Sequence, residues 1–451
     1  MSIRLNALVE RLRGSLFFVP MLFVLIGGAA GVAMVEVDAA LDDQATEFPL
    51  VLTSTVGSAR EVLSVVAAAT ITVAGIAFSI SLLVIQQASG QYSPRVVHSL
   101  FRDPFNRRVV ALAVGTFTYC LMVLRAVRSS VEDAGEPVVP NLSVALAVVL
   151  GVAAILAIVA FIDHNAHTME VSQILQRVTQ ETLAQIDSIW PEGGDGSATG
   201  RPPEAPDGPG HAVLLASSGW IQQLSARQLL DLVPEGGTVR VETAPGRFAV
   251  RGTPLCTVWP APDDPESAQR RAAEAIEVGR ARTLQQDPSY GIRQLADVAL
   301  VALSPGVNDP TTAQDAIFHL AEVLGVALAR DLPTGIEDDE RDRRVVFAEA
   351  PTHATLVELA FDEIRRAAAA HPAVCIYLLE ALHLVERSLV AAGHPGRVPP
   401  LRRQAELTVA GARRADLLHD DLREVLRAFS RRFGDTGRHV PAPATDPPGG
   451  G

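Results

Sequence analysis

The sequence predicts a mainly α-helical membrane protein with four transmembrane helices and a cytoplasmic α+β region. The segment 62–94 is about 33 residues long without a charged residue or a histidine, whereas roughly 20 helical residues already cross the hydrocarbon core of a bilayer. Three further uncharged stretches of similar character lie within residues 1–170. After them the chain becomes polar, first alternating in the manner of strands and then helical, which predicts a small β-sandwich or barrel-like module and a helical bundle.

The transmembrane domain is predicted to occupy residues 1–170, with spans at about 15–36, 62–86, 106–127 and 141–163. Arginines precede the first apolar stretch, so a signal peptide is the competing interpretation. The stretch is longer than a typical signal segment and more spans follow, which favours a retained helix. Gly27 and Gly31 lie four residues apart in it, a spacing that lets another helix approach closely.

The distribution of arginine predicts the orientation. Arginine clusters at the N-terminus and after the second span, whereas the loop between the first two spans is acidic. The positive-inside rule therefore places both termini in the cytoplasm and the protein in the inner membrane, although two arginines after the third span count against this orientation. In the arginine-rich segment, Ser93, Pro94 and Arg95 begin a short helix expected to lie in the headgroup layer.

The composition excludes several kinds of chemistry. The net charge of -13 argues against a nucleic-acid partner. Every one of the 38 basic side chains counted as Lys or Arg is an arginine, so covalent biotin, covalent lipoate and a lysine Schiff base are all excluded. The three cysteines fit no zinc or disulfide spacing, no catalytic motif is present, and we expect no cofactor and no enzymatic activity.

Beyond the spans, the chain divides into five predicted segments. They are a juxtamembrane helix at 171–190, a Gly/Pro-rich linker at 191–210, a β-rich module at 211–285, a helical domain at 286–433 and a disordered tail at 434–451.

Within the β-rich module, Thr238–Thr243 alternates as a strand does, and Arg247–Val258 is expected to form two short strands around Gly252. The spacing of glycine and apolar residues from Pro245 to Leu255 resembles the hairpin of barrel-sandwich domains of the biotinyl/lipoyl type. Carriers of that type attach their cofactor to a lysine, which this chain lacks, so the resemblance concerns architecture alone.

In the helical domain, Asp287 and Asp309 each precede a proline, and both are predicted to cap the helix that follows. The segment between these helices should reverse the chain into a helical hairpin; its key residues are Ser304, Pro305, Gly306, Asn308, Asp309 and Pro310. A charged loop is expected at 331–344, followed by helices at roughly 352–370, 372–392 and 401–433.

Four stretches resemble a bacterial family of predicted multispanning membrane proteins of unknown function. They are Ile71–Ser79, Gln91–Arg95, Asp287–Leu295 and Ser304–Ala313. The resemblance implies a multispanning membrane protein with a soluble C-terminal domain, and it brings no established activity or catalytic residue.

The second span carries the first set of candidate functional residues, namely Thr72, Ser79, Ser81 and Gln86. A helix that lines a water pathway in an oligomer would carry such hydroxyls. A helix buried in a bundle would carry them too, because Ser and Thr can bond their own i-4 carbonyls and small residues serve packing.

Two further candidates have simpler alternatives. Asp163, His167 and Glu170 share one helical face and could hold a metal ion or relay protons, but ordinary polarity where a span leaves the bilayer is the favoured explanation, because ionisable groups at helix ends can reach water. The helix start at Pro310 could bind an anion, although Asp309 already supplies a negative cap and favours a structural turn.

These observations predict a protein that contacts the lipid bilayer and assembles with copies of itself, as a homo-oligomeric channel or transporter-like assembly with a cytoplasmic sensing domain. The competing hypothesis is a non-transport scaffold or signalling protein that uses its spans as an anchor. An enzyme is the third and least supported option.

Overall fold

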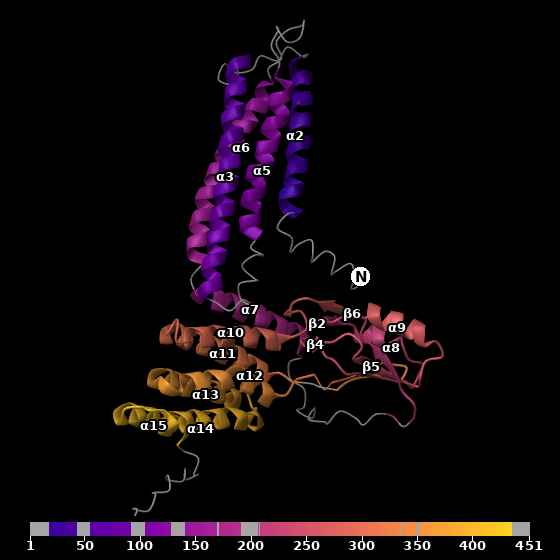
Figure 1. The fold of residues 1–451 in the computed structure, drawn as a ribbon, viewed down its shortest axis with the longest axis vertical. Helices are drawn as coiled ribbons and strands as arrows, with labels where there is room; N and C mark the ends of the chain where they lie inside the picture. Colours follow the sequence, from indigo (N-terminus) through magenta and orange to yellow (C-terminus); the bar gives the residue numbers. More distant parts are fainter. Residues whose placement is uncertain are drawn as a thin grey trace, which may run out of the picture. The chain divides into compact units, whose positions relative to one another are not determined.

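The computed structural model describes residues 18–42, 55–91, 104–127, 140–168, 171–190, 206, 208–333, 335–348 and 351–434. The chain divides into a membrane unit, Met1–Ile174, and a C-terminal unit, Leu175–Gly451. Most of the described residues are helical, and the strands form two open sheets within the C-terminal unit (Figure 1).

Four helices in the membrane unit are long and apolar enough to cross a bilayer. They are α2 (Phe18–Asp42), α3 (Val56–Gln91), α5 (Pro104–Ala126) and α6 (Asn141–Thr168). At 36 residues, α3 spans about 54 Å, well beyond the roughly 30 Å of hydrocarbon in a bilayer. The four helices match the predicted spans in number and approximate place.

Glycine allows the close approach of α2 and α5. A Cβ atom added at Gly27 would lie 2.2 Å from the carbonyl oxygen of Gly115, and one added at Gly31 would lie 2.7 Å from Cβ of Met122. The two helices therefore touch through their backbones, as the four-residue spacing of Gly27 and Gly31 predicts.

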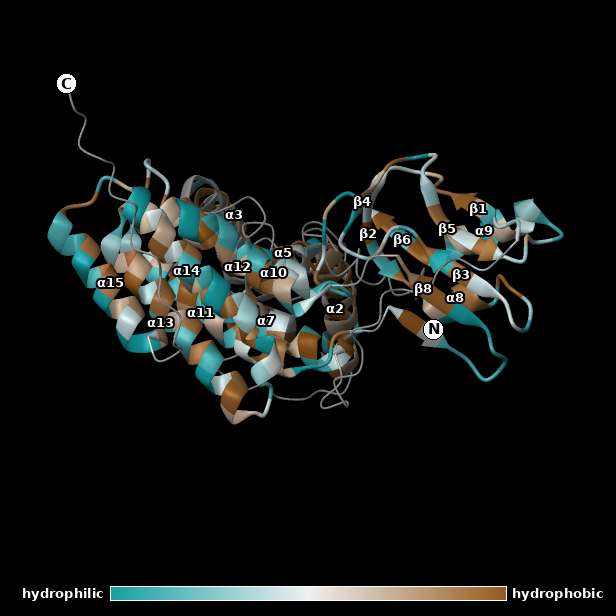
Figure 2. Cartoon of the chain, turned by 90° about the horizontal axis from the view of Figure 1, so that it is seen from below, coloured by the Kyte–Doolittle hydropathy of each residue, from teal (hydrophilic) through white to brown (hydrophobic). Residues whose placement is uncertain are grey.

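Paired helices form most of the C-terminal unit. The helices are α7 (Val171–Ile189), α10 (Pro288–Ala302), α11 (Pro310–Ala329), α12 (His353–Ala367), α13 (Pro372–Ala391), α14 (Pro399–Arg414) and α15 (His419–Phe433). Helices α10, α12 and α14 contact one another in that order, and α11, α13 and α15 form a parallel series beside them (Figure 1). Each helix turns an apolar side inward, and α15 separates hydrophilic from hydrophobic residues most clearly (Figure 2).

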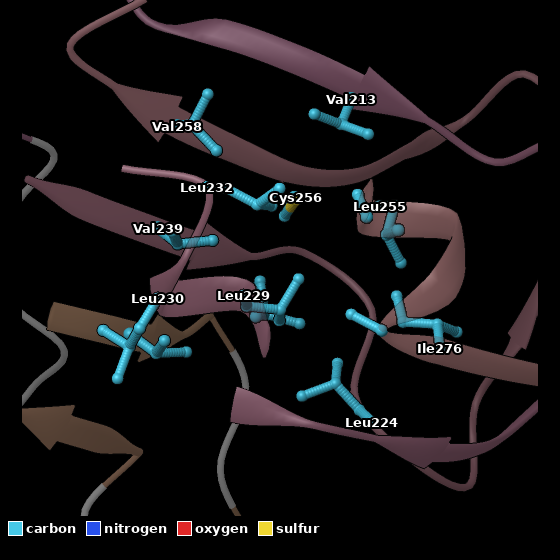
Figure 3. Packing of buried hydrophobic residues seen from close by; sticks show 14 of the residues in the cluster. Val213, Leu224, Leu229, Leu230, Leu232, Val239, Leu255, Cys256, Val258 and Ile276 are labelled. Carbon is cyan, nitrogen blue, oxygen red and sulfur yellow. The ribbon is translucent and has the colours of Figure 1, made fainter. Parts of the chain in front are cut away.

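Two sheets and two short helices form the β-rich module. A five-stranded sheet has the order β1-β5-β3-β8-β7, and a three-stranded sheet has the order β4-β2-β6. The strands are β1 (His211–Leu214), β2 (Gly219–Leu224), β3 (Thr238–Val241), β4 (Phe248–Ala249), β5 (Pro254–Trp259), β6 (Ile276–Gly279), β7 (Ile336–Asp338) and β8 (Arg344–Phe347). Side chains from both sheets meet those of α8 (Ala226–Leu230) and α9 (Pro265–Glu274) in one apolar core (Figure 3).

The strands around Gly252 do not form the expected hairpin. Strand β4 pairs with β2, whereas β5 pairs with β1 and β3 in the other sheet. The chain crosses from one sheet to the other at Gly252, whose φ of 84° lies in the left-handed region that favours glycine.

Two further expectations are wrong in detail. The charged loop 331–344 contains β7 and the start of β8, and β8 pairs in parallel with β3. Val345 and Val346 are buried in this strand. The strand was not predicted because so short an apolar pair between charged residues does not stand out in the sequence. The helix expected at 401–433 is two helices, since Ala415 is extended and α15 begins anew with Asp420 and Asp421 in its first turn.

Candidate functional site

The candidate pathway residues of the second span lie on different sides of α3. Thr72, Ser79 and Gln86 are exposed on the outer face of the four-helix unit, and Ser81 is half-buried. Each hydroxyl donates a hydrogen bond to the carbonyl four residues earlier: Thr72 to Ala68 at 2.7 Å, Ser79 to Gly75 at 2.9 Å and Ser81 to Ala77 at 2.8 Å. Such bonds satisfy a hydroxyl without water or a partner helix.

Exposed residues of α3 that are, except for Leu82, either small or polar form a continuous stripe. Successive members are three or four residues apart, so that the stripe runs along one side of the helix. Every member is exposed in the described unit: Gly57, Glu61, Ser64, Ala68, Thr72, Gly75, Ser79, Leu82 and Gln86. We call this set the α3 stripe.

The exposed faces of α2 and α6 have the opposite composition. On α6 they present large aliphatic side chains, among them Val149, Val152, Leu156 and Val159, which are each at least half exposed. Met21, Leu25 and Ile26 do the same on α2. Such surfaces suit contact with lipid. The α3 stripe itself carries one large apolar side chain, Leu82, although large apolar side chains are also exposed beside the stripe on the same helix: Val65, Ile71, Ile76, Phe78 and Leu83.

The interior of the membrane unit is held by polar contacts near the two ends of α6. The buried carboxylate of Asp38 accepts hydrogen bonds from the backbone N–H groups of Leu142 and Ser143, at 2.9 and 2.8 Å, and thereby caps α6 from another helix. Near the other end, Asn106 and Asn165 exchange two amide hydrogen bonds of 3.1 Å. Both sets of hydrogen bonds join residues of different helices and so fix the positions of these helices.

The second candidate set cannot be assembled from the described part of the chain. Asp163 is exposed near the end of α6. The side chain of His167 and the whole of Glu170 lie outside the described residues, as do Ser93, Pro94 and Arg95 of the predicted headgroup helix. Among the residues that are described, no group of three His, Cys, Asp or Glu side chains could hold a metal ion.

The segment from Ser304 to Pro310 forms the tight turn between α10 and α11. Asp309 accepts hydrogen bonds from the backbone N–H of Thr311 and Thr312 at 3.1 Å and from the Thr312 hydroxyl at 2.6 Å. These bonds hold the pKa of Asp309 below its ordinary value of 3.8. Asn308 adopts a left-handed φ of 49°, which asparagine tolerates. The carboxylate therefore occupies the amides that an anion would need.

Asp287 does not cap α10, contrary to the prediction. Its side chain makes no capping hydrogen bond and instead pairs with the Arg282 guanidinium, whose Nε lies 2.6 Å from Oδ2. Burial raises the pKa of Asp287 above 3.8, while the Arg282 bond and charge act in the opposite direction.

Aromatic rings and a glycine enclose this buried pair. The guanidinium carbon of Arg282 lies 5.2 Å from the ring centre of Tyr290 and 5.9 Å from that of Trp220, within reach of cation–π attraction. A Cβ atom added at Gly246 would lie 2.1 Å from Oδ2 of Asp287. The pair thus joins the three-stranded sheet to the first turn of α10.

Reciprocal amide bonds extend the same junction. Gln286 accepts from the Leu224 N–H at 2.8 Å and donates to the Leu224 carbonyl at 3.1 Å. Gln185 of α7 donates to the Gln285 carbonyl at 2.8 Å. The sequence analysis identified the stretch Asp287–Leu295 but did not predict that Asp287 would pair with an arginine in a buried site. The only local indication of this pair was Arg282, five residues before Asp287.

The cysteines offer no reactive thiol in the C-terminal unit. Burial raises the pKa of Cys256 to about 12 and that of Cys375 to about 11. Both thiols are therefore protonated near neutral pH and poor nucleophiles.

The sequence is similar to a family of predicted membrane proteins and to proteins described as uncharacterized. The family described as "Predicted membrane protein (DUF2254)" matches residues 13–383. The chain is 31% identical over 436 residues to an uncharacterized protein of Mycobacterium bovis and, to the same extent, to one of Mycobacterium tuberculosis. Each match covers 95% of this chain and 82% of the relative. No solved structure matches the chain.

Proposed function

We propose that this chain, which belongs to the predicted membrane protein family DUF2254, is the protomer of a homo-oligomeric channel or transporter-like assembly. The α3 stripes of neighbouring protomers meet at or line a shared axis, and the C-terminal unit serves as the sensing region. The observation that carries this proposal is the composition of the α3 stripe.

Small residues drive helix association in membranes because lipid tails are as apolar as leucine side chains, so that close backbone packing decides the outcome. Gly75 and Ser79 are four residues apart on the exposed face of α3, as are Ala68 and Thr72. Both α2 and α6 expose large aliphatic side chains that suit lipid, whereas α3 exposes a stripe of small and polar residues between its own large apolar side chains. We therefore assign the contact with a second copy to this stripe.

Oligomerisation is required for conduction in this proposal. Thr72, Ser79 and Gln86 are exposed on the outside of the four-helix unit, so a path that uses them lies between protomers. Glu61 and Gln86 near the ends of the stripe would supply polar entrances.

Cysteine cross-linking of the full-length protein in its native membrane tests the interface. Ser79→Cys should yield disulfide-linked dimers under mild oxidation, and the matched control Val152→Cys on α6 should not. The native cysteines of the chain are buried, so they do not obscure the result. Equal cross-linking at both positions, or none at position 79, would overturn the interface.

Flux measurements test the activity. Purified protein in liposomes should pass ions or small solutes, and Gly75→Leu should reduce flux by separating the α3 helices, whereas Val152→Leu should not. Complete absence of flux under varied pH and tension would refute the channel.

A membrane-anchored scaffold or signalling protein is the second candidate. The internal hydrogen bonds of Thr72, Ser79 and Ser81 favour it, because hydroxyls satisfied in this way tolerate lipid. Monomeric protein in nanodiscs with an impermeable membrane would support this candidate.

The orientation is proposed from the sequence. The arginine-rich segments favour an orientation with both termini in the cytoplasm of a bacterial cell and the protein in the inner membrane. In intact cells, an impermeant thiol reagent should label Ala45→Cys in the acidic loop and spare Arg102→Cys. The reverse pattern would contradict this topology.

A further inference from the structure

A short segment at the edge of the three-stranded sheet exposes an unusual combination of side chains. The segment Arg247–Arg251 lies between two glycines with left-handed backbones, Gly246 and Gly252. Arg247, Phe248, Val250 and Arg251 are exposed, and Ala249 alone points into the core. More than half of the surface of Phe248 (55%) and of Val250 (53%) is exposed.

The backbone of this segment is fixed on both sides. The N–H of Ile221 donates to the Arg247 carbonyl at 2.9 Å, and the N–H of Gly252 donates to the Leu215 carbonyl at 2.9 Å. The N–H of Arg251 donates to the Ser218 hydroxyl at 2.9 Å. A rigid backbone holds the apolar side chains outward, so their exposure is a feature of the fold.

Neighbouring strands enlarge the surface. Trp220 of β2 lies opposite Phe248 and meets its ring edge-on, with 5.6 Å between ring centres. On the other side of β2, Trp220 lies opposite Gly279 of β6, which is followed by the exposed Arg280. We call the set Arg247, Phe248, Val250, Arg251, Trp220 and Arg280 the β4 surface.

The chemistry of the β4 surface matches an anionic bilayer interface. Phe248 and Val250 lie close together on a fixed backbone, next to Trp220 and between arginines, and this combination of apolar, aromatic and positive groups is what distinguishes the surface from scattered exposed apolar residues. All exposed charges in the Arg247–Arg251 segment are positive, although the whole chain has a net charge of -13. Aromatic rings favour the headgroup layer of a bilayer, and arginine forks fit lipid phosphates.

A bilayer is always available to this unit. Helix α6 ends at Thr168 and α7 begins at Val171, so that two residues join the last span to α7. Helix α7 is in turn fixed to the C-terminal unit, where Thr179 contacts His319 at 3.0 Å and Asp187 pairs with Arg330 at 2.5 Å. Such a short tether gives the membrane surface a high effective concentration.

We propose that the β4 surface docks on the anionic surface of the bilayer in which the chain is embedded. Phe248 and Val250 enter the interfacial layer, and Arg251 and Arg280 pair with lipid phosphates.

The test uses the full-length protein reconstituted into phosphatidylcholine vesicles with or without phosphatidylglycerol. Val250→Cys carries an environment-sensitive fluorophore, and the native cysteines are buried. The fluorophore should shift to the blue, and lipids brominated near the headgroup should quench it, when phosphatidylglycerol is present. High salt should reverse the shift.

Charge variants give the matched comparison. Arg251→Gln with Arg280→Gln should lower the docked-to-undocked ratio about 30-fold, since each arginine near an anionic surface contributes about 1 kcal/mol. Arg423→Gln with Arg427→Gln, on the exposed basic side of α15, should leave the ratio unchanged. Unaltered thermal unfolding of each variant would show that the fold is intact.

Three outcomes would overturn the proposal. The fluorophore could stay aqueous in both kinds of vesicle, or it could be quenched equally without phosphatidylglycerol. It could also be shielded in lipid-free detergent in proportion to protein concentration, which would assign the surface to a second copy of the chain.

Discussion

Two aspartate–proline dipeptides open consecutive helices of the C-terminal unit and carry out different tasks. Asp309 caps α11 with three hydrogen bonds to Thr311 and Thr312. Asp287 makes no capping hydrogen bond at the start of α10 and instead pairs with Arg282 in a buried site. The side chain of Asp287 is 8% exposed in that pair. The dipeptide fixes where a helix begins, but the surroundings decide what its carboxylate does.

The difference is one of solvation. Asp309 lies at the surface, where backbone N–H groups are its best partners. At Asp287 the chain packs Gly246 and two aromatic rings around the carboxylate. A charge out of water requires a countercharge, and Arg282 supplies it.

The largest expected effect comes from removing the buried carboxylate. Asp287→Ala leaves the Arg282 guanidinium buried without its partner, which should cost about 3 kcal/mol, or roughly 6–12 °C in Tm. All three tryptophans, Trp190, Trp220 and Trp259, lie in the C-terminal unit, so fluorescence-detected unfolding of full-length protein in detergent reports on this unit.

The matched substitution Asp309→Ala removes a surface cap. It should cost about 1 kcal/mol, or roughly 2–4 °C in Tm, measured in the same way. Equal Tm losses for the two variants would erase the distinction between the two dipeptides.

A glycine substitution next to the buried pair should have the second largest effect. In Gly246→Ala, the new methyl group meets Asp287 and the backbone must keep a φ of 82°, so we expect a loss of about 2 kcal/mol. The control Gly306→Ala in the α10–α11 turn has nothing within 4 Å and should gain up to about 0.5 kcal/mol. Denaturant unfolding of both variants measures the difference, and a tolerated Gly246→Ala would contradict the tight enclosure.

The two carboxylates should give pH dependences of opposite sign. The pKa of Asp287 is raised in the folded state, so its contribution to stability is present below pH 3.8 and is lost as pH rises through the raised pKa. The pKa of Asp309 is lowered, so its contribution is present above pH 3.8 and is lost as pH falls through the lowered pKa.

The measurement is Tm against pH for the wild type, Asp287→Asn and Asp309→Asn. The wild-type advantage over Asp287→Asn should shrink as pH rises above 3.8, and the advantage over Asp309→Asn should shrink as pH falls below it. Parallel curves would show that neither carboxylate has a shifted pKa.

The smallest expected effect concerns Asn308 in the surface turn. Asn308→Gly should change stability by less than about 0.5 kcal/mol, because glycine adopts the left-handed φ of 49° freely. Asn308→Ala should lose about 1 kcal/mol, because a Cβ without a hydrogen-bonding group is disfavoured there. Chemical denaturation compares the two, and an equal response to both substitutions would show that the turn is not strained.

Local features of the sequence were sufficient for the four spans and for the α10–α11 turn. An uncharged run of helical length has few fates other than a bilayer. At Ser304–Pro310, turn residues and the cap act within a few positions of one another. In both cases all the interacting groups lie in one short stretch.

Distant pairings were not predictable in the same way. Strand β8 is recognisable only beside β3, about a hundred residues earlier, and the strands flanking Gly252 separated into two sheets. The α3 stripe could not be predicted either, because apolar residues occur on every side of α3. Only the packing of α5 and α6 against α3 decides which of its residues stay exposed.

By itself, then, the sequence determined that the chain has four helices long and apolar enough to cross a membrane, where several helices begin, and that lysine chemistry is absent. These properties follow from length, charge and local bonding. Tertiary structure alone decided that Asp287 would be buried against Arg282, that β4 and β5 would join different sheets, and that Phe248 would remain outside the core. Those outcomes depend on which surfaces meet across long stretches of chain, and a residue's solvation is fixed only when they do.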